Sequence, residues 1–413
     1  MMIALMATVG TMFLACSDDK LGDSIFDTHD YPLDRTSYTF PLDTFIKKNF
    51  LEPYNLKFIY RMEDVGTDMQ KNVVPASYEK SVDLAILTKY LWLDVYKKLG
   101  GEEFLKINSP KIIHVLGSPA YNSDGSRTVG LAEGGIKVSL MEANRLDVNQ
   151  IEGDFGLNQL FFHTMHHEFG HILDQTYLHP TTFNTLSSGL YDGVGWADKN
   201  DSVQASLGFV TPYGSSSQNE DWVETLACYV TYDQTRWDKL LNTAQYDWEE
   251  IDMPLDTFEL RYPGAYREQL NYEYGLIDSY TKYDRDTVGY IRQMANYDYK
   301  VDRKLIKRSG DDFAEVDSLG RPTFLEADQI NGRTTILEKL DLVRSWLQYW
   351  NIDIDELRKE VQNRQYLTDE DGNFILDEKN RFINRLTQPY EGDPSKLLID
   401  VLRQEIEEYK KLQ

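Results

Sequence analysis

Alternating apolar and polar residues predict short strands in the first third of the chain. Leu56, Phe58 and Tyr60 fall on one face of a period-two pattern, as expected of a half-buried strand. The segment Glu133-Gly134-Gly135 separates two further alternating stretches, which are predicted to pair as a hairpin. The predicted strands cover 55–62, 110–117, 127–132 and 136–141.

Apolar residues that recur every three or four positions predict helices through most of the remaining chain. Gly100-Gly101 is expected to end the first helix, Asp353 to cap the fifth together with Glu356, and Asp393-Pro394 to start the last. The predicted helices cover 84–99, 158–176, 220–237 and 334–350, and two more begin near 354 and 393.

The order of these elements predicts an α+β fold, in which a twisted mixed sheet lies beside a long helix. We assign the sheet and the long helix to a catalytic domain over 46–250. Residues 251–413 are expected to form a mostly helical C-terminal region of unknown role, and the polar segment 16–45, rich in Pro, Asp and Thr, is expected to be a tether.

The N-terminus carries a candidate export signal. Residues 1–15 are apolar or small, and Phe13-Leu14-Ala15-Cys16 resembles the end of a bacterial lipoprotein signal peptide. Cys16 would then carry lipid and anchor the chain in the cell envelope, most consistently in the outer membrane. The acidic residues that follow Cys16 resemble surface-export signals of Bacteroidetes lipoproteins. The alternative is an apolar N-terminal segment that carries no lipid.

Charge and cysteine content narrow the possible functions. The chain of 413 residues has 43 basic and 68 acidic residues, for a formal charge of −25, and this charge would repel a phosphate backbone. Nucleic acid is therefore not expected as a partner. Cys16 and Cys228 are the only cysteines, so the chain has no disulfide framework.

Candidate metal chemistry is concentrated in one helix. Five of the seven histidines lie within residues 163–179, and they include the run His167-Glu168-Phe169-Gly170-His171. On a helix, residues four apart share a face, so His167 and His171 can bind one Zn²⁺ while Glu168 takes a proton from a water molecule. The alternative is a histidine-rich core helix without metal. His163 and His166 are expected to pack or form hydrogen bonds, and Cys228 to be buried.

A third zinc ligand is expected further along the chain. Glu220 and Glu224 share one face of the helix predicted over 220–237, so one can bind zinc while the other accepts the second N–H of a ligand histidine. Spacing alone does not decide between them, and both could instead be solvated carboxylates at a helix N-terminus. A metzincin-type third histidine is excluded, because position 177 is Tyr.

At these residues the sequence resembles the zincin proteases, and over 163–224 their lethal-factor-type branch. That branch shares the His-Glu-Phe-Gly-His run, an acidic residue three positions later, here Asp174, and a Tyr-Gly pair before two glutamates. The resemblance implies that Tyr213 stabilises an oxyanion and that Glu220 is the third ligand. It also implies that Glu224 and Asp174 support the ligands from outside the coordination sphere.

Over nearly its whole length the sequence resembles the substrate import-associated zinc metallohydrolase lipoproteins of the Bacteroidetes. This resemblance implies association with an outer-membrane nutrient-uptake complex. Our first hypothesis is therefore an extracytoplasmic zinc peptidase that acts on peptides or glycoproteins. The second is an accessory lipoprotein without hydrolytic activity, which contains zinc and binds glycan or glycopeptide through the aromatic residues of its C-terminal region.

Overall fold

The computed structural model describes most of the chain outside the N-terminus and two long segments before residue 331. The described residues are 33–62, 73–121, 127–128, 130–133, 137–153, 155–244, 248–254, 300–306, 331–379 and 381–413. The predicted signal peptide, Cys16, most of the tether and most of the tyrosine-rich part of the C-terminal region lie outside these residues.

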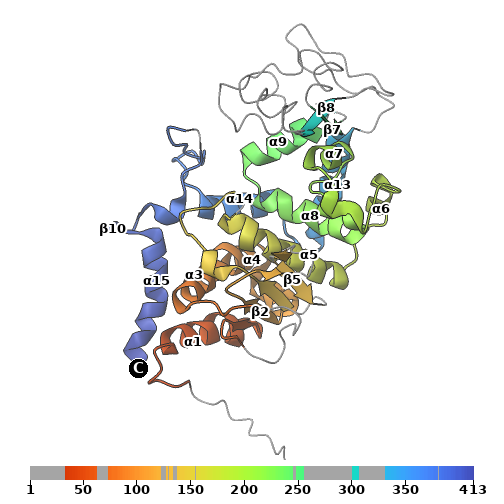
Figure 1. Ribbon diagram of the computed structural model, residues 1–413. Helices are drawn as coiled ribbons and strands as arrows, with labels where there is room; N and C mark the ends of the chain where they lie inside the picture. The colour runs from red at the N-terminus through yellow and green to blue at the C-terminus, as the bar shows by residue number, and fades with distance from the viewer. Residues whose placement is uncertain are drawn as a thin grey trace, which may run out of the picture.

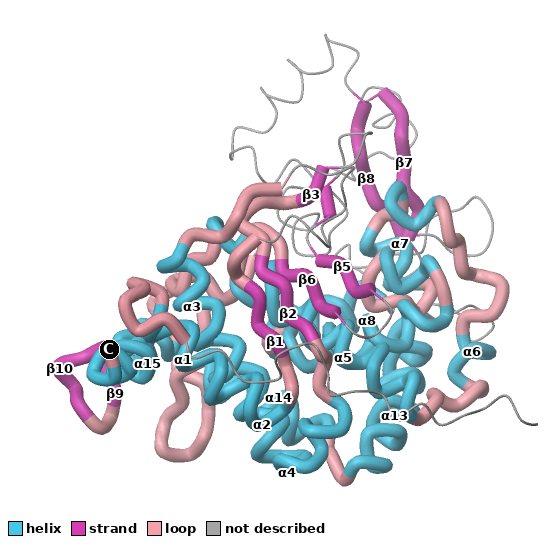
Figure 2. Tube along the Cα trace, turned by 90° about the horizontal axis from the view of Figure 1, so that it is seen from below, coloured by secondary structure: helices cyan, strands magenta, loops and turns pink. Residues whose placement is uncertain are grey.

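A four-stranded mixed sheet forms the β part of the fold (Figure 2). Its order is β1-β2-β6-β5, in which β1 and β2 and also β2 and β6 run parallel, while β5 and β6 are antiparallel. The predicted hairpin is thus confirmed as β5 and β6. The strands are β1 (Lys57–Ile59), β2 (Ile112–Val115), β5 (Gly130–Glu133) and β6 (Lys137–Leu140), and a two-stranded ribbon is formed by β3 (Ala120–Tyr121) and β4 (Arg127–Thr128).

Helices precede and interrupt this sheet. They are α1 (Phe40–Ile46), α2 (Glu52–Tyr54), α3 (Tyr78–Thr88) and α4 (Asp94–Asn108), with π turns at Lys47–Leu51 and Lys89–Leu93. One predicted boundary was wrong. The tether was expected to reach residue 45, but α1 starts at Phe40 and is almost wholly buried, so its apolar residues belong to the core. The predicted break at Gly100-Gly101 is confirmed, because Gly101 has a non-helical backbone with φ +87° and divides α4 into two helical parts.

Two long helices carry the candidate chemistry. The predicted helix 158–176 is a π turn, Asn158–Phe162, that continues into α5 (His163–Thr176). The predicted helix 220–237 is two helices, because the backbone is extended at Tyr232. These are α8 (Gln218–Thr231) and α9 (Gln234–Ala244); α6 (Phe183–Leu186), α7 (Asp201–Ser206) and short 3₁₀ turns at Ala143–Arg145, Gly195–Asp198 and Tyr213–Ser216 lie before them.

Within the residues that the structure describes, the C-terminal part is mostly helical, but it is not a separate layer. Its elements are β7 (Trp248–Pro254) paired with β8 (Lys300–Ile306), α13 (Gly332–Leu347), α14 (Ile354–Gln365), β9 (Pro389–Tyr390), β10 (Asp393–Leu397) and α15 (Leu398–Glu407), with 3₁₀ turns at Gln348–Trp350, Arg385–Thr387 and Glu408–Leu412. The last helix begins at Leu398, not at Asp393-Pro394, because those two residues lie in β10.

Helices α13 and α14 pack on α8, and α15 lies along α1 and α3 (Figure 1). One continuous core joins residues of the sheet, of α5 and α8, and of these C-terminal helices. The buried aliphatic residues Ile336, Leu340 and Val343 of α13 belong to it. A division at residue 250 would therefore cut through one hydrophobic core. None of the helices in the described residues has both the length and the apolar character needed to cross a bilayer.

Candidate metal centre

Three histidines on α5 lie one turn apart on the same face. The ring centroids of His163 and His167 are 6.1 Å apart, and those of His167 and His171 are 4.9 Å apart. This follows from the helical period, which places residues four apart above one another. A π turn ends directly before His163, and π turns are frequent at functional sites.

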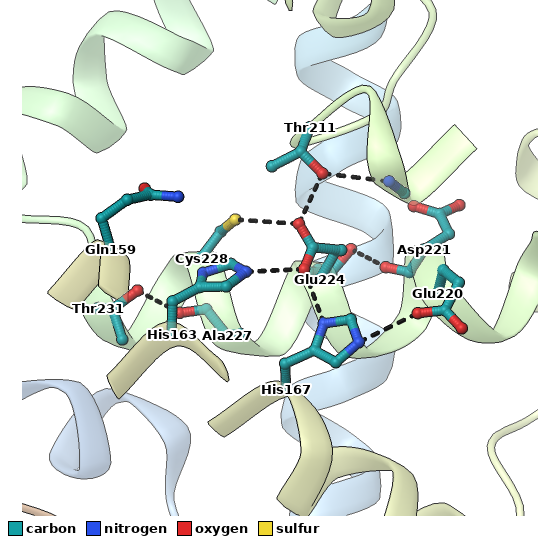
Figure 3. Close-up of polar contacts among 12 residues, drawn as sticks. Gln159, His163, His167, Thr211, Glu220, Asp221, Glu224, Ala227, Cys228 and Thr231 are labelled. Atoms are coloured by element: carbon teal, nitrogen blue, oxygen red, sulfur yellow. Dashed lines mark hydrogen bonds and ion pairs between the residues drawn. The ribbon is translucent and has the colours of Figure 1, made fainter. Parts of the chain in front are cut away.

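Helix α8 brings its acidic residues to this row of histidines (Figure 3). The side chain of Ser217 accepts a hydrogen bond from the backbone N–H of Glu220, which caps the helix and fixes Glu220 in its first turn. Glu224 follows one turn later on the same face. The two helices approach closely at Gly170, where an added Cβ would lie 2.9 Å from Cγ1 of Val223.

Glu220 faces both predicted histidine ligands. Its Oε2 lies 3.0 Å from Nε2 of His167 and 3.3 Å from Nε2 of His171. Ligand atoms held about 2.1 Å from a tetrahedral zinc ion are roughly 3.4 Å apart, so this spacing fits one ion between the three side chains. Two imidazoles and a carboxylate are also a donor set that suits zinc. The residues present therefore fit a single zinc ion.

Electrostatics hold these three groups together in the absence of a metal. Burial would lower the pKa of His167, but its hydrogen bonds to Glu220 and Glu224 outweigh this and raise the pKa to about 10. Burial would likewise raise the pKa of Glu220, yet the bonds to His167 and His171 lower it to about 2. A metal cation would replace the proton that these groups share.

Glu168 lies beside the three ligands and not among them. It is buried, and its Oε2 has no hydrogen-bond partner within the described part of the chain. Burial raises the pKa of Glu168 above its ordinary value, while the nearby rings of His167 and His171 act in the opposite direction. A buried carboxylate with a free oxygen and a raised pKa is suited to accepting and returning a proton.

Glu224 occupies the other side of His167. Its Oε1 lies 2.7 Å from Nδ1 of His167, and its Oε2 accepts a 2.6 Å hydrogen bond from the hydroxyl of Thr211. Because the carboxylate can only accept, Nδ1 of His167 carries the proton and Nε2 is left to face Glu220. Spacing alone left open which glutamate is the third ligand. Glu220 lies at Nε2 of His167 and His171, whereas Glu224 lies at Nδ1 of His167, so the geometry favours Glu220.

Tyr213 lies next to His167, one of the predicted ligands. Its ring stacks on His167 at 5.8 Å between centroids, and the ring of Trp196 contacts it edge-on at 4.8 Å. The side chain is about one-third exposed. Burial and the negative charge of Glu220 raise the pKa of Tyr213, so the phenol keeps its proton at neutral pH. It can therefore donate an O–H bond to a developing negative charge.

Asp174 was expected to support the zinc ligands, but it lies beside another residue. Its carboxylate accepts hydrogen bonds from Nδ1 of His179 at 2.9 Å and from the backbone N–H of the same residue at 2.7 Å. The turn that follows α5 brings His179 back onto this carboxylate. Within the residues that the structure describes, the bonds of Asp174 go to His179 and not to a zinc ligand.

Sequence reasoning missed part of the surroundings of the site. His163 was expected to pack or hydrogen-bond, and its Nε2 lies 2.7 Å from Oε1 of Glu224, so it contacts the same oxygen as His167. Its position four residues before His167 was the available signal. Thr211 and Trp196 carry no comparable signal in the sequence. Only the folded chain brings Thr211 to Glu224 and Trp196 to Tyr213.

Comparison with known proteins also points to a zinc-binding chain. A family model described as "Putative zinc-binding metallo-peptidase" matches residues 36–355 of the 413. The chain belongs to this family. A crystal structure of a putative zinc-binding metallo-peptidase from Bacteroides caccae is similar, with 28% sequence identity and a TM-score of 0.52, and the match covers 79% of this chain and 93% of that one. No curated protein matches the chain.

Membership in this family establishes a zinc-binding chain of the metallohydrolase class with a zincin-like α+β fold. The family match runs through the predicted boundary at residue 250 and reaches the start of α14. This range agrees with the single core, in which α13 and α14 pack on α8.

Proposed function

We propose that this protein is an extracytoplasmic, lipid-anchored zinc peptidase. The observation that carries the proposal is the position of one carboxylate oxygen, Glu220 Oε2, within 3.3 Å of Nε2 of both His167 and His171, with the buried carboxylate of Glu168 beside them. The two histidines and Glu220 would hold a zinc ion, which could then also bind a water molecule, and Glu168 would be its proton acceptor.

Each residue would have a separate task in peptide hydrolysis. When bound, zinc lowers the pKa of a coordinated water molecule to about 7 and polarises the carbonyl group of the substrate. Glu168 accepts the proton of the attacking water at its free Oε2 and then returns it to the leaving amine. Tyr213 donates its O–H to the oxygen that becomes negatively charged on the former carbonyl carbon.

An extended substrate would bind along β5. This strand is the last of the four-stranded sheet, and α5 packs beside it and beside β6. Backbone groups at the edge of a sheet can pair with an added peptide strand, which holds the scissile bond extended. A peptide or an unfolded stretch of a glycoprotein fits this mode of binding.

The cellular setting is part of the same proposal. Lipid on Cys16 would anchor the enzyme to the outer membrane, next to an uptake complex that imports the products. The lipoprotein-like run Phe13-Leu14-Ala15-Cys16 and the acidic residues after it support this placement. Labelling of cells with a radioactive fatty acid tests it, because Cys16→Ala should abolish incorporation.

A peptidase assay tests the catalytic part of the proposal. Purified protein is expected to cleave casein or a glycoprotein, to lose activity with a chelator and to regain it with Zn²⁺. Glu168→Gln should keep stoichiometric zinc and lose about 10²- to 10⁴-fold in rate. Glu102→Gln is the matched control, because Glu102 is half-exposed and pairs with Lys97 and Lys106 on α4.

Two results would contradict the proposal. Retained hydrolysis in Glu168→Gln would remove this residue as the proton acceptor. Stoichiometric zinc without hydrolysis of any peptide or glycoprotein would favour the second hypothesis, an accessory glycan-binding lipoprotein.

A further inference from the structure

We propose that His163 is a positioning residue of the zinc site, which acts through Glu224 to hold the ring of His167 with Nε2 towards the metal. The inference rests on the zinc site of the proposed function and adds a residue to it. His163 itself does not face Glu220, and its Nε2 lies 2.7 Å from Oε1 of Glu224.

Two imidazole rings share one oxygen of Glu224. Oε1 of Glu224 lies 2.7 Å from Nε2 of His163 and 2.7 Å from Nδ1 of His167. Both nitrogens must donate, since an ionised carboxylate only accepts. The second oxygen of Glu224 is held by Thr211 at 2.6 Å. The carboxylate is therefore fixed by three donors and cannot rotate without losing one of them.

Glu224 and His167 are both buried. Glu224 is 3% exposed and His167 6% exposed, so water has little access to replace a lost donor. A short hydrogen bond to a carboxylate in such surroundings orients the N–H of His167 strongly.

A second metal ion is the competing explanation for this cluster. His163, Glu224 and Cys228 each offer one ligand atom, and these atoms lie within 4.8 Å of one another. A cation there would need the lone pair of Nε2 of His163 and an oxygen of Glu224. Nε2 of His163 lies only 2.7 Å from Oε1, well short of the roughly 3.4 Å between two ligand atoms of one tetrahedral zinc ion, and the same oxygen orients His167. This short contact fits a hydrogen bond better than a shared metal, and one zinc per chain is expected.

Paired substitutions at residue 163 test the proposal. His163→Leu removes the donor at similar volume, whereas the amide of His163→Gln reaches as far as the imidazole Nε2 and can still donate to Glu224. We expect His163→Leu to weaken zinc binding by about 10- to 100-fold, measured by competition with a chromophoric chelator. His163→Gln is expected to remain within about threefold of wild type.

Cobalt provides a readout that a merely structural role would not change. The visible absorption of the Co²⁺-substituted protein reports ligand geometry, so it should shift in His163→Leu, in which the ring of His167 is free to turn, and return in His163→Gln. Should His163→Leu fail to fold, His163→Asn replaces it, because its shorter amide does not reach Glu224. Equal zinc affinity and an unchanged cobalt spectrum in the variant that lacks the donor would overturn the proposal.

The number of metal ions per chain distinguishes a positioning role of His163 from a second metal site at His163, Glu224 and Cys228. Wild type and Cys228→Ala should each contain one zinc per chain with similar affinity, because Sγ of Cys228 lies 4.0 Å from Glu224 and is not needed to hold it. Two metals in wild type and one in Cys228→Ala would overturn the positioning role in favour of a second site. Wild type that binds zinc but hydrolyses nothing would contradict the proposed function alone, since the affinity measurement on His163 requires no catalysis.

Discussion

Lys339 of α13 and Asp221 of α8 form a 2.6 Å ion pair in which neither side chain has exposed surface. Nζ of Lys339 also donates to the backbone oxygen of Gly208 at 2.7 Å, and the hydroxyl of Tyr191 donates to the same carboxylate oxygen at 2.9 Å. One buried ammonium group thus connects the C-terminal part, the loop before the site and the residue next to Glu220.

This ion pair fixes the position of α13 relative to α8 more than it adds to the net stability of the fold. Burial raises the pKa of Asp221 to about 6, against the opposing influence of Lys339, and burial also lowers the pKa of Lys339. Both shifts mean that the loss of hydration outweighs the attraction of the opposite charge. Buried pairs of this kind are costly to form, and removing one partner is more costly still.

Lys339→Met should therefore destabilise the protein strongly, because it leaves Asp221 buried without its cation. The expected loss is about 3–5 kcal/mol in the free energy of unfolding at neutral pH, measured by denaturant titration with chelator present. The double variant Lys339→Met/Asp221→Asn should recover most of it, since no charge is left unpaired. Lys359→Met, at an exposed position on α14, should change the stability by less than about 0.5 kcal/mol. A wild-type midpoint in Lys339→Met would show that the pair does not hold α13 to α8.

Gly170→Ala should weaken zinc binding although alanine is the better helix former. The new Cβ would lie 2.9 Å from Cγ1 of Val223 and 3.2 Å from Cδ2 of Leu226, so the side chain of Val223 must shift. Because the Cβ of Val223 is also only 3.2 Å away, we expect this shift to displace α8 from α5. Overpacking costs about 1–3 kcal/mol, which exceeds the gain of about 1 kcal/mol in helix propensity. Zinc affinity and thermal stability should both fall.

A compensating substitution tests the reason for this effect. Gly170→Ala/Val223→Ala makes room for the new methyl group and should regain zinc affinity relative to Gly170→Ala alone. Val223→Ala by itself is the reference for the cavity it leaves. If the double variant bound zinc no better than Gly170→Ala, close packing at this point would not be what sets the ligand positions.

Two periods of apolar residues, the helical one and the alternating one of strands, explain why much of the fold could be predicted from sequence. The α+β class, the hairpin of β5 and β6 and the existence of α5, α13 and α14 follow from apolar spacing. The π turn at Asn158–Phe162 does not, because its side chains are as apolar as those of a regular helix turn. Asp393-Pro394 was misread as a helix start, since the same residues also suit a turn or an edge strand.

In the candidate site, too, some residue positions could be predicted from sequence and others could not. His167, Glu168 and His171 are one turn of one helix, so their relation is fixed by local geometry. The distinct positions of Glu220 and Glu224 depend on how α8 packs on α5, which sequence spacing does not determine. The position of Asp174 could not be predicted either, since its contact with His179 depends on the path of the chain after α5.

Tyr213→Phe tests the electrophilic role of the phenol. The ring contacts with His167 and Trp196 remain, so zinc affinity and thermal stability should match wild type. Only the O–H is lost, and removing one donor to an oxyanion costs about 10²- to 10³-fold in kcat. KM should change little. A kcat within about threefold of wild type would assign Tyr213 to packing.

The contact between His179 and Asp174 predicts a pH dependence of stability that is separate from metal binding. Nδ1 of His179 lies 2.9 Å from Asp174, Nε2 lies 3.0 Å from Oδ1 of Asn184, and the ring stacks on Trp222 at 4.9 Å. Two acceptors facing both nitrogens favour the doubly protonated ring. Burial would lower the pKa of His179, but the hydrogen bond and charge of Asp174 raise it above 6.5.

Because the folded pKa is the higher one, this contact contributes its full stability below pH 6.5 and loses it as the pH rises through the raised value. The difference in unfolding free energy between wild type and His179→Gln, measured with chelator from pH 5.5 to 9, should therefore shrink as the pH rises. Asp174→Asn should flatten the dependence, because the charge that holds the proton is gone. A difference that stays constant or grows with pH would mean that His179 is neutral in the folded protein, and that Asn184 presents its N–H₂ group to the ring.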